Sequence, residues 1–264
     1  MQTHYCPFDD DASLDCYPVE GASAAVVICP GGGYTFLSKW EDTFIARAFN
    51  EAGYHAFVLH YSVENPPLGW RPLRQLGWAV SAVRGGKIPG MPGIQKVAVC
   101  GFSAGGHLAA SLGVQWHNPA LFGQDVDLLL QRPDALVLSY PVISGGDYAH
   151  KGSFTQLAGA DSVAWAYFSL EKLVSEKSVP AFLWHAVPDE SVPMQNSLLF
   201  FEQLLQYGVA AELHLYPFGT HGMSLATPEV ARPAENRLAD PHVATWMPLA
   251  QHWLTDIFSG RAEA

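Results

Sequence analysis

Residues 96–110, KVAVCGFSAGGHLAA, decide the fold of this chain and indicate its chemistry. A short apolar run leads into Gly-Phe-Ser-Ala-Gly, and a helix-forming segment follows at once. In such a G-x-S-x-G pattern the serine lies on a sharp turn and stands clear of the sheet, while the flanking glycines let strand and helix approach closely. The pattern predicts Ser103 as a nucleophile. The alternative is an ordinary strand-to-helix turn of small residues.

Strand and helix patterns alternate along most of the chain. Short apolar runs rich in β-branched and aromatic residues predict buried strands at residues 24–29, 55–61, 96–100, 135–140, 181–185 and 212–216. Helix-like stretches occupy residues 42–52, 73–84, 103–114, 194–207 and 243–258. Apolar strands separated by helices indicate an α/β fold with a mostly parallel central sheet and helices on both faces. Residues 1–15 predict one or two additional antiparallel strands.

Residues 145–178 interrupt this alternation. The segment carries Trp165, Tyr167 and Phe168 and lies between two predicted strands. Long insertions of this kind often cover active sites. We therefore expect a small lid-like insertion within a single domain that spans residues 1–264. Trp165 and Phe168 are candidates for closing over the acyl group of a substrate.

A glycine-rich turn, CPGGGY at residues 29–34, follows the first buried strand. Acyl transfer needs two or three hydrogen-bond donors aimed at the developing oxyanion. We expect these donors to be the N–H groups of Gly32, Gly33 and Ala104, the residue after the nucleophile. A phosphate-binding loop or a plain turn is the alternative, although the dinucleotide and Walker glycine spacings are absent. Tyr34 is a candidate pocket wall or a core residue.

Two later strands are each followed by a polar residue suited to act with Ser103. Asp189 comes just after the strand at residues 181–185, where a carboxylate can orient an imidazole and stabilise its charged form. Glu190 is the nearest rival for this role and Asp161 a distant one. His221 follows the next strand on a loop between glycines and is the predicted base. The other histidines considered are expected to be structural or exposed: His107, His214, His242 and His252.

The composition excludes several classes of protein. The chain has 264 residues, of which 49% are hydrophobic and only 15% charged, with 14 Lys and Arg against 25 Asp and Glu and a net charge of −11. These values exclude a disordered chain, a coiled coil and a basic nucleic-acid-binding protein. A chain this acidic repels phosphate backbones and anionic membranes, so we expect no nucleic acid or membrane partner and a small neutral ester as substrate.

Targeting signals and metal motifs are not apparent in the sequence. The first residues form neither a basic nor an apolar region, and no stretch approaches about 18 consecutive apolar residues, so we expect neither a signal peptide nor a membrane span. Four cysteines without a CxxC pair favour free thiols and a cytoplasmic location, with a Cys6–Cys16 disulfide as the alternative. The histidines form no HExxH motif or ligand-spaced cluster, so we expect no metal and no other cofactor.

Taken together, these segments resemble the α/β-hydrolase esterases, and among them the acetyl-esterase and acetylxylan-esterase-like carbohydrate esterases. ICPGGGYTFLS with Glu41 is similar to their oxyanion segment, and GFSAGGHLAASLG to their nucleophile helix. AFLWHAVPDESVPMQNSLLF and ELHLYPFGTHGMSLA are similar to their acid and histidine segments. The order Ser103, Asp189, His221 is that of the α/β-hydrolase triad. The resemblance covers nearly the whole chain and implies hydrolysis of short acyl esters, often acetyl groups on sugars or xylo-oligosaccharides, through an acyl-enzyme.

Three residues depart from the esterase pattern near the expected site. Pro30 stands where the broader lipase group has the histidine of its HGGG motif, which argues against membership of that group. Trp40 precedes Glu41 where a basic residue is expected, and Pro188 precedes Asp189 where a second aspartate is expected. The last two departures concern the choice of substrate.

Two other functions stay open on the sequence. The Asp-x-x-Val-Pro pattern at residues 189–193 also occurs in enzymes similar to prolyl oligopeptidase, so a serine peptidase or amidase of the same fold is one alternative. A non-catalytic binding module that keeps the fold is the other. The intact set of serine, aspartate and histidine argues against such a module, because a non-catalytic protein has no physical need for all three residues.

Overall fold

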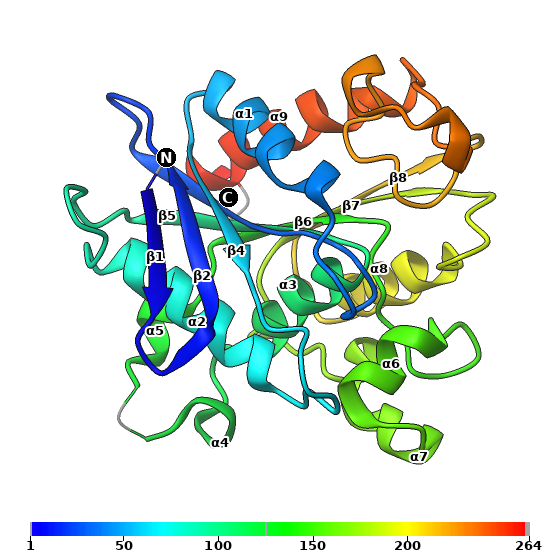
Figure 1. The fold of residues 1–264 in the computed structure, drawn as a ribbon, viewed down its shortest axis with the longest axis horizontal. Coiled ribbons are helices and arrows are strands. Elements are labelled where there is room, and N and C mark those ends of the chain that lie inside the picture. The colour runs from blue at the N-terminus through cyan, green and yellow to red at the C-terminus, as the bar shows by residue number, and fades with distance from the viewer. Residues whose placement is uncertain (1, 125, 262–264) are drawn as a thin grey trace.

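In the computed structural model, which describes residues 2–124 and 126–261, eight strands form one sheet in the order β1-β2-β4-β3-β5-β6-β7-β8 (Figure 1). The strands are β1 (Gln2–Cys6), β2 (Asp9–Tyr17), β3 (Ala24–Cys29), β4 (His55–His60), β5 (Lys96–Phe102), β6 (Ala135–Ser139), β7 (Ala181–Ala186) and β8 (Ala211–Tyr216). β2 pairs antiparallel with β1 and β4, and every other neighbouring pair is parallel. The predicted mostly parallel sheet with antiparallel N-terminal strands is confirmed.

The central strands are almost wholly apolar because both faces of the sheet are covered. In β5, Val97 and Val99 belong to the hydrophobic cluster on one face, while Ala98, Cys100 and Phe102 belong to the cluster on the other. Successive side chains of a strand point to opposite faces, so a doubly covered strand needs apolar residues at every position. This explains the unbroken hydrophobic runs of the sequence.

Long helices cover the two faces of the sheet (Figure 1). One face is covered by α1 (Thr43–Glu51) and α9 (Trp246–Phe258). The other face is covered by α2 (Arg71–Arg84), α3 (Ala104–Gln115) and α8 (Gln195–Gln206). Two one-turn helices, α4 (Pro119–Phe122) and α5 (Leu128–Gln131), lie beside α2. The α/β fold with helices on both faces is therefore confirmed.

Residues 145–178 form short helices instead of a regular crossover. They are α6 (Lys151–Ala158), α7 (Ser162–Trp165) and two 3₁₀ turns, Ala166–Phe168 and Leu170–Lys172. Phe154, Leu157 and Leu170 from this segment join the hydrophobic cluster that also contains the apolar faces of α2 and α3. These apolar side chains therefore anchor the insertion to the hydrophobic cluster on this face of the sheet.

The expected site lies at one edge of the sheet. The glycine-rich turn follows β3, Ser103 follows β5, Asp189 follows β7 and His221 follows β8. The carboxyl ends of parallel strands meet at the same edge, which is where open α/β sheets bind their ligands. The fold thus brings together four segments that are far apart in the sequence.

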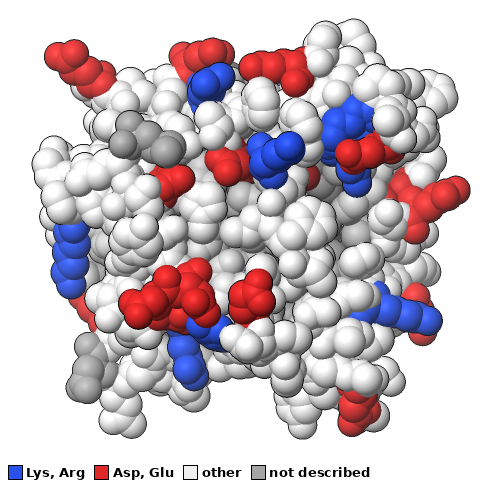
Figure 2. Space-filling model, in the orientation of Figure 1, with Lys and Arg blue, Asp and Glu red and all other residues white. Residues whose placement is uncertain are grey.

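Charged side chains are sparse on the surface shown in Figure 2, as the low charged fraction of the sequence predicts, and the cysteines are free. On the face shown in Figure 2, charged side chains are few and wide uncharged areas separate them. All four cysteines are buried and free, so the alternative of a Cys6–Cys16 disulfide is wrong. Within residues 2–124 and 126–261, no helix has the length and apolar character needed to cross a membrane.

Candidate active site

Ser103 lies on the tight turn between β5 and α3. Its backbone has φ 52° and ψ −116°, a strained conformation for a residue with a side chain. A Cβ atom on Gly105 would lie 2.1 Å from the carbonyl oxygen of Cys29, and one on Gly101 would lie 2.3 Å from the carbonyl oxygen of Gly105. The N–H of Ser103 donates to the carbonyl of Ser139 at 3.0 Å. Only glycine fits on either side of this turn, as the sequence pattern predicts.

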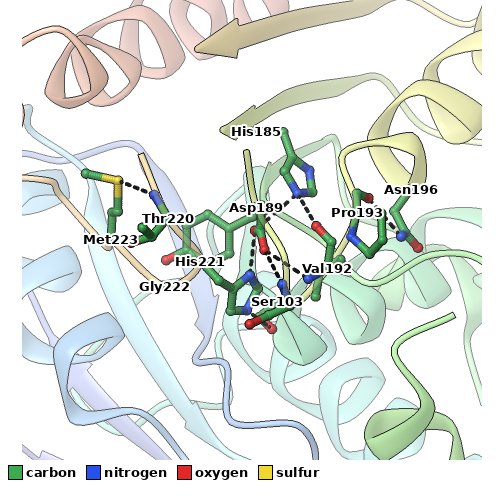
Figure 3. A network of polar contacts seen from close by, with 12 residues as sticks. Ser103, His185, Asp189, Val192, Pro193, Asn196, Thr220, His221, Gly222 and Met223 are labelled. Carbon is green, nitrogen blue, oxygen red and sulfur yellow. Dashed lines mark hydrogen bonds and ion pairs between the residues drawn. The ribbon is translucent and has the colours of Figure 1, made fainter. Parts of the chain in front are cut away.

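His221 links Ser103 to Asp189 (Figure 3). The Nε2 atom of His221 lies 2.8 Å from Ser103 Oγ, and its Nδ1 atom lies 2.7 Å from Asp189 Oδ2. A carboxylate only accepts hydrogen bonds, so Nδ1 carries the proton and Nε2 is free to accept from the serine hydroxyl. The three residues selected from the sequence therefore form one hydrogen-bonded chain.

Asp189 is held by four donors, and its side chain is fully buried. Its Oδ1 atom accepts from the N–H groups of Ser191 and Val192, each at 2.9 Å. Its Oδ2 atom lies 2.7 Å from His221 and 3.4 Å from Nε2 of His185. Burial by itself raises the pKa of Asp189, but the hydrogen bonds from His185 and His221 outweigh it and hold this pKa well below its usual range. The carboxyl group is therefore ionised and directed at His221.

A cleft of about 550 Å³ opens at Ser103 and His221. This volume lies within the range of small-molecule sites. One wall comes from the loop after β3, residues 32–33 and 35–41. Other lining residues are Ser191, Gly222, Arg232, Glu235 and Arg237. His150 contributes from the 145–178 insertion. The cleft gives a small molecule access to the serine hydroxyl.

The expected oxyanion donors surround the serine end of the cleft. Gly32 and Gly33 line the cleft, and Ala104 is the first residue of α3. Within the described parts of the chain, no hydrogen bond takes the N–H of Gly32, Gly33 or Ala104. The first N–H groups of a helix have no partner inside the helix and favour bound anions. The arrangement can thus offer free donors to a negatively charged oxygen.

The three aromatic residues considered as substrate contacts are not among the residues that line this cleft. Tyr34 is buried, and its hydroxyl lies 3.0 Å from His107 Nδ1. Trp165 donates from Nε1 to the carbonyl of Gly159, and its ring packs on Phe154. Polar partners and core contacts hold these rings away from the described cleft, and Tyr34 takes its alternative role as a core residue.

The ring of Phe168 packs at a tilt against Trp70, with ring centroids 4.4 Å apart. It is buried in the hydrophobic cluster that includes α2 and α3. Its backbone carbonyl accepts a hydrogen bond from Nε2 of His107 at 2.8 Å, which ties the insertion to α3. Phe168 therefore packs the insertion onto the body of the protein and does not reach the cleft.

Two arginines at the cleft hold the loop that carries the histidine. Arg237 donates from Nε to the carbonyl of His221, and Arg232 donates to the carbonyl of Gly222, both at 2.9 Å. Glu235 accepts from both guanidinium groups. These residues follow the histidine motif in a stretch without a recognised pattern, so no sequence signal predicts their role.

His150 was also not selected from the sequence. Its Nδ1 atom lies 2.8 Å from the hydroxyl of Ser153. Burial, and to a smaller extent the neighbouring His221, lowers the pKa of His150, which favours the neutral imidazole. No cluster of three or more His, Cys, Asp or Glu residues that could hold a metal occurs among the described residues.

A nucleophile turn of this type on a mostly parallel sheet, with the acid and histidine on later strands, defines an α/β-hydrolase. Comparison with known families then places the chain more closely. The chain belongs to the prolyl oligopeptidase family, whose model matches residues 92–239. The matched segment includes Ser103, Asp189 and His221 but not the glycine-rich turn.

The chain is also similar to proteins named for xylan-directed hydrolysis. It is 33% identical over 226 residues to endo-1,4-β-xylanase B of Butyrivibrio fibrisolvens and 28% identical over 230 residues to acetylxylan esterase of Xylanibacter ruminicola. The matches cover 84% and 83% of this chain but only 34% and 45% of those proteins. The chain therefore spans less than half the length of either relative.

A solved structure covers more of both chains. The acetyl ester-xyloside bifunctional hydrolase of Caldicellulosiruptor lactoaceticus superposes with a TM-score of 0.78 at 35% identity, over 93% of this chain and 88% of that one. The resemblance to α/β-hydrolase esterases of the acetylxylan-esterase type is thus confirmed.

Proposed function

We propose that the protein is a serine esterase that hydrolyses short acyl esters, with Ser103 as nucleophile, His221 as base and Asp189 as its orienting acid. The observation that carries the proposal is the 2.8 Å contact between Ser103 Oγ and His221 Nε2 at the base of an open cleft. No metal or organic cofactor takes part.

The proposed reaction has two halves. His221 Nε2 takes the proton of Ser103 while Oγ attacks the ester carbonyl, and Asp189 stabilises the imidazolium that forms. The N–H groups of Gly32, Gly33 and Ala104 stabilise the tetrahedral oxyanion. His221 then protonates the departing alcohol. Water repeats the sequence on the acyl-enzyme and releases the acid.

Acetyl groups on sugars or xylo-oligosaccharides are the substrates that the comparisons favour. Two of the similar proteins are named as an acetylxylan esterase and an acetyl ester-xyloside hydrolase. The net charge of −11 supports a neutral ester as the substrate and argues against a nucleic acid or membrane partner. Four free cysteines support a cytoplasmic location, because thiols persist in reducing compartments.

Replacing the nucleophile tests the proposal. We expect Ser103→Ala to lower kcat/KM for p-nitrophenyl acetate by at least about 10⁴-fold while leaving the circular dichroism spectrum unchanged, because the attacking oxygen is lost. Ser162→Ala removes an exposed hydroxyl on α7 and is the control. Full activity of Ser103→Ala would contradict the assignment.

Substrate class requires a second assay. We expect acetate release from acetylated xylo-oligosaccharides and a fall in kcat/KM as the acyl chain of p-nitrophenyl esters lengthens. A release rate no higher than that of Ser103→Ala would reject the sugar esters, and an unchanged rate on long acyl chains would reject the short-acyl preference.

A peptidase or amidase is the second candidate, because the matching family model is that of prolyl oligopeptidase. Parallel assays on an aminoacyl p-nitroanilide and on p-nitrophenyl acetate separate the two, and we expect the ester to be the faster substrate. A non-catalytic module would fail both assays and would also fail to react with a fluorophosphonate probe.

A further inference from the structure

Glu41 is a carboxylate buried beside the cleft. It is only 3% exposed and ends the short 3₁₀ helix Lys39–Glu41. A buried carboxylate is costly unless hydrogen bonds replace its water. Its Oε2 atom accepts from the N–H of Gly31 at 2.8 Å, and its Oε1 atom accepts from the hydroxyl of Tyr140 at 2.6 Å. Each oxygen of this one group therefore holds a donor from a different segment, and the proposed reaction uses neither oxygen.

The first contact fixes the loop that carries the expected oxyanion donors. A Cβ atom on Gly31 would lie 2.7 Å from Glu41 Oε2 and 3.1 Å from Ser103 Cβ, so the backbone of Gly31 fits closely between the carboxylate and the nucleophile turn. The carbonyl of Gly31 accepts from the N–H of Ser38 at 2.9 Å and closes the loop. Gly32 follows directly. Glu41 thus sets the position of the peptide that precedes the free N–H groups.

The second contact leads to the loop that carries the histidine. The Tyr140 hydroxyl donates to Glu41 and accepts from the N–H of Ser224 at 3.0 Å. The Tyr140 ring packs edge-on against the imidazole of His221, with centroids 5.0 Å apart. Ser224, three residues after His221, also donates from its hydroxyl to the carbonyl of Trp40. Ser224 therefore joins the histidine loop to the loop of Glu41 twice, once through Tyr140 and once directly through Trp40.

The direction of these hydrogen bonds depends on the carboxylate. Burial, and then the nearby negative charge of Glu41, raises the pKa of Tyr140 well above its usual range, so its hydroxyl keeps the proton that it donates. A glutamine of the same shape can accept through only one oxygen. It would leave either the Gly31 N–H or the Tyr140 O–H without an acceptor, and a buried donor without an acceptor is destabilising.

We propose that Glu41 is a positioning residue that joins the oxyanion loop, residues 31–38, to the histidine loop, residues 219–224, and holds both in register around Ser103. The proposal rests on the proposed esterase function for its kinetic consequence. The joining of the loops itself is a statement about structure, so it can be tested without activity.

The kinetic test uses two variants. We expect Glu41→Gln to lower kcat for p-nitrophenyl acetate by about 10-fold to 100-fold with KM within about twofold, because misplaced oxyanion donors weaken the transition state more than the ground state. We expect Tyr140→Phe, which keeps the ring against His221, to lower kcat in the same way. Because both changes act through one contact, their effects in the double variant should be less than additive.

The structural test is amide hydrogen exchange. We expect faster exchange in both loops, residues 31–38 and 219–224, for Glu41→Gln and for Tyr140→Phe, whether or not the substrate is correct. Glu171→Gln is the control, since this side chain also accepts two hydrogen bonds, from the hydroxyls of Ser144 and Ser169, and does not line the cleft. Both bonds fall on Oε1, so a glutamine can keep them. It should leave kcat and the exchange of both loops unchanged.

The outcomes separate the two proposals. If the wild-type protein hydrolyses no ester, the proposed function fails, and amide exchange in the two loops then decides the role of Glu41. If Glu41→Gln shows the same amide exchange and the same kcat as the wild-type protein, the positioning role is overturned. If that variant does not fold, Tyr140→Phe decides in its place. The positioning role would also be overturned if Glu41→Gln lost kcat only in proportion to its loss of thermal stability and Glu171→Gln lost kcat in the same way.

Discussion

The hydrogen bonds of His185 show how the acid is held. Nε2 of His185 lies 2.9 Å from the carbonyl of Val192 and 3.4 Å from Asp189 Oδ2, and both are acceptors. Nε2 therefore carries the proton, and Nδ1 accepts from the hydroxyl of Ser197 at 2.8 Å. Because the folded-state pKa of Asp189 is depressed, its ionised form stabilises the fold above the ordinary pKa of aspartate. This contribution is lost as the pH falls through the folded-state pKa.

His107 also destabilises the fold as the pH falls, but it does so over a higher pH interval than Asp189. It is buried on α3, where its Nε2 atom donates to the carbonyl of Phe168 and its Nδ1 atom accepts from Tyr34. Burial, opposed by the Phe168 contact, lowers the pKa of His107 from 6.5 to about 4. Between these two values the unfolded chain binds a proton that the folded chain does not. The free energy of unfolding therefore falls as the pH falls from 6.5 to about 4.

Replacing His107 tests this dependence. We expect His107→Gln to remove up to about 3 kcal/mol of the loss in unfolding free energy over that pH interval, since one unit of pKa corresponds to about 1.4 kcal/mol. Urea denaturation at pH 7, 5.5 and 4.5 measures it. His252→Gln, which removes an exposed imidazole, is the control and should keep the wild-type slope. An equal slope in His107→Gln would contradict the assigned cause.

The sequence could locate Ser103, Asp189 and His221 because each follows a recognisable strand, and parallel strands bring such positions to one edge. It could not assign a role to Glu41 or His185. Glu41 meets Tyr140 across 99 residues, and His185 is surrounded in sequence by apolar strand residues. Proximity in sequence to a motif was also misleading, because Tyr34, beside the glycines, turns into the core.

At the scale of elements, the nucleophile turn depends on how closely α3 approaches β3. A Cβ on Gly105 would lie 2.1 Å from the carbonyl oxygen of Cys29 and 2.4 Å from that of Pro30, and backbone atoms cannot move aside as a side chain can. We expect Gly105→Ala to lower the free energy of unfolding by about 3 kcal/mol or more and to abolish ester hydrolysis. Urea denaturation and the p-nitrophenyl acetate assay measure the two effects.

Gly152→Ala on α6 is the matched control, since its added Cβ would lie 3.4 Å from the nearest atom, Cε1 of His150. We expect it to be neutral or to stabilise by about 0.5–1 kcal/mol, because alanine is the better helix former. A Gly105→Ala protein as stable as this control would show that the helix can move away from the strand without cost.

Strand positions were predictable to within about two residues because the central strands are almost wholly apolar. Helix ends were less so. The helix expected at residues 243–258 begins with a 3₁₀ turn, Val243–Thr245, and becomes α-helical only at Trp246. The short helices of the 145–178 insertion were not predicted. α7, for example, is a single turn whose Val163 N–H is capped by the side chain of Asp161. So short a segment shows no hydrophobic period.

At the scale of the whole molecule, the two hydrophobic clusters share the same strands. In β7, Leu183 belongs to the cluster with α2, α3 and α8, while Phe182 and Trp184 belong to the cluster with α1 and α9. The central strands contribute side chains to both clusters, so unfolding of one cluster would also disrupt the strands on which the other cluster packs. This supports the expectation of a single cooperative domain over residues 1–264 with residues 145–178 as an insertion.

Two adjacent substitutions in β7 test that cooperativity. Phe182 and Leu183 are both fully buried and lie on opposite faces of the sheet. We expect Phe182→Ala to lower the free energy of unfolding by about 3–5 kcal/mol and Leu183→Ala by about 2–5 kcal/mol. In each variant, the urea transition should move as a whole, with coincident midpoints by far-ultraviolet circular dichroism and tryptophan fluorescence. If the two clusters instead unfolded separately, one substitution would split the transition into two steps, and the midpoints by circular dichroism and by tryptophan fluorescence would differ.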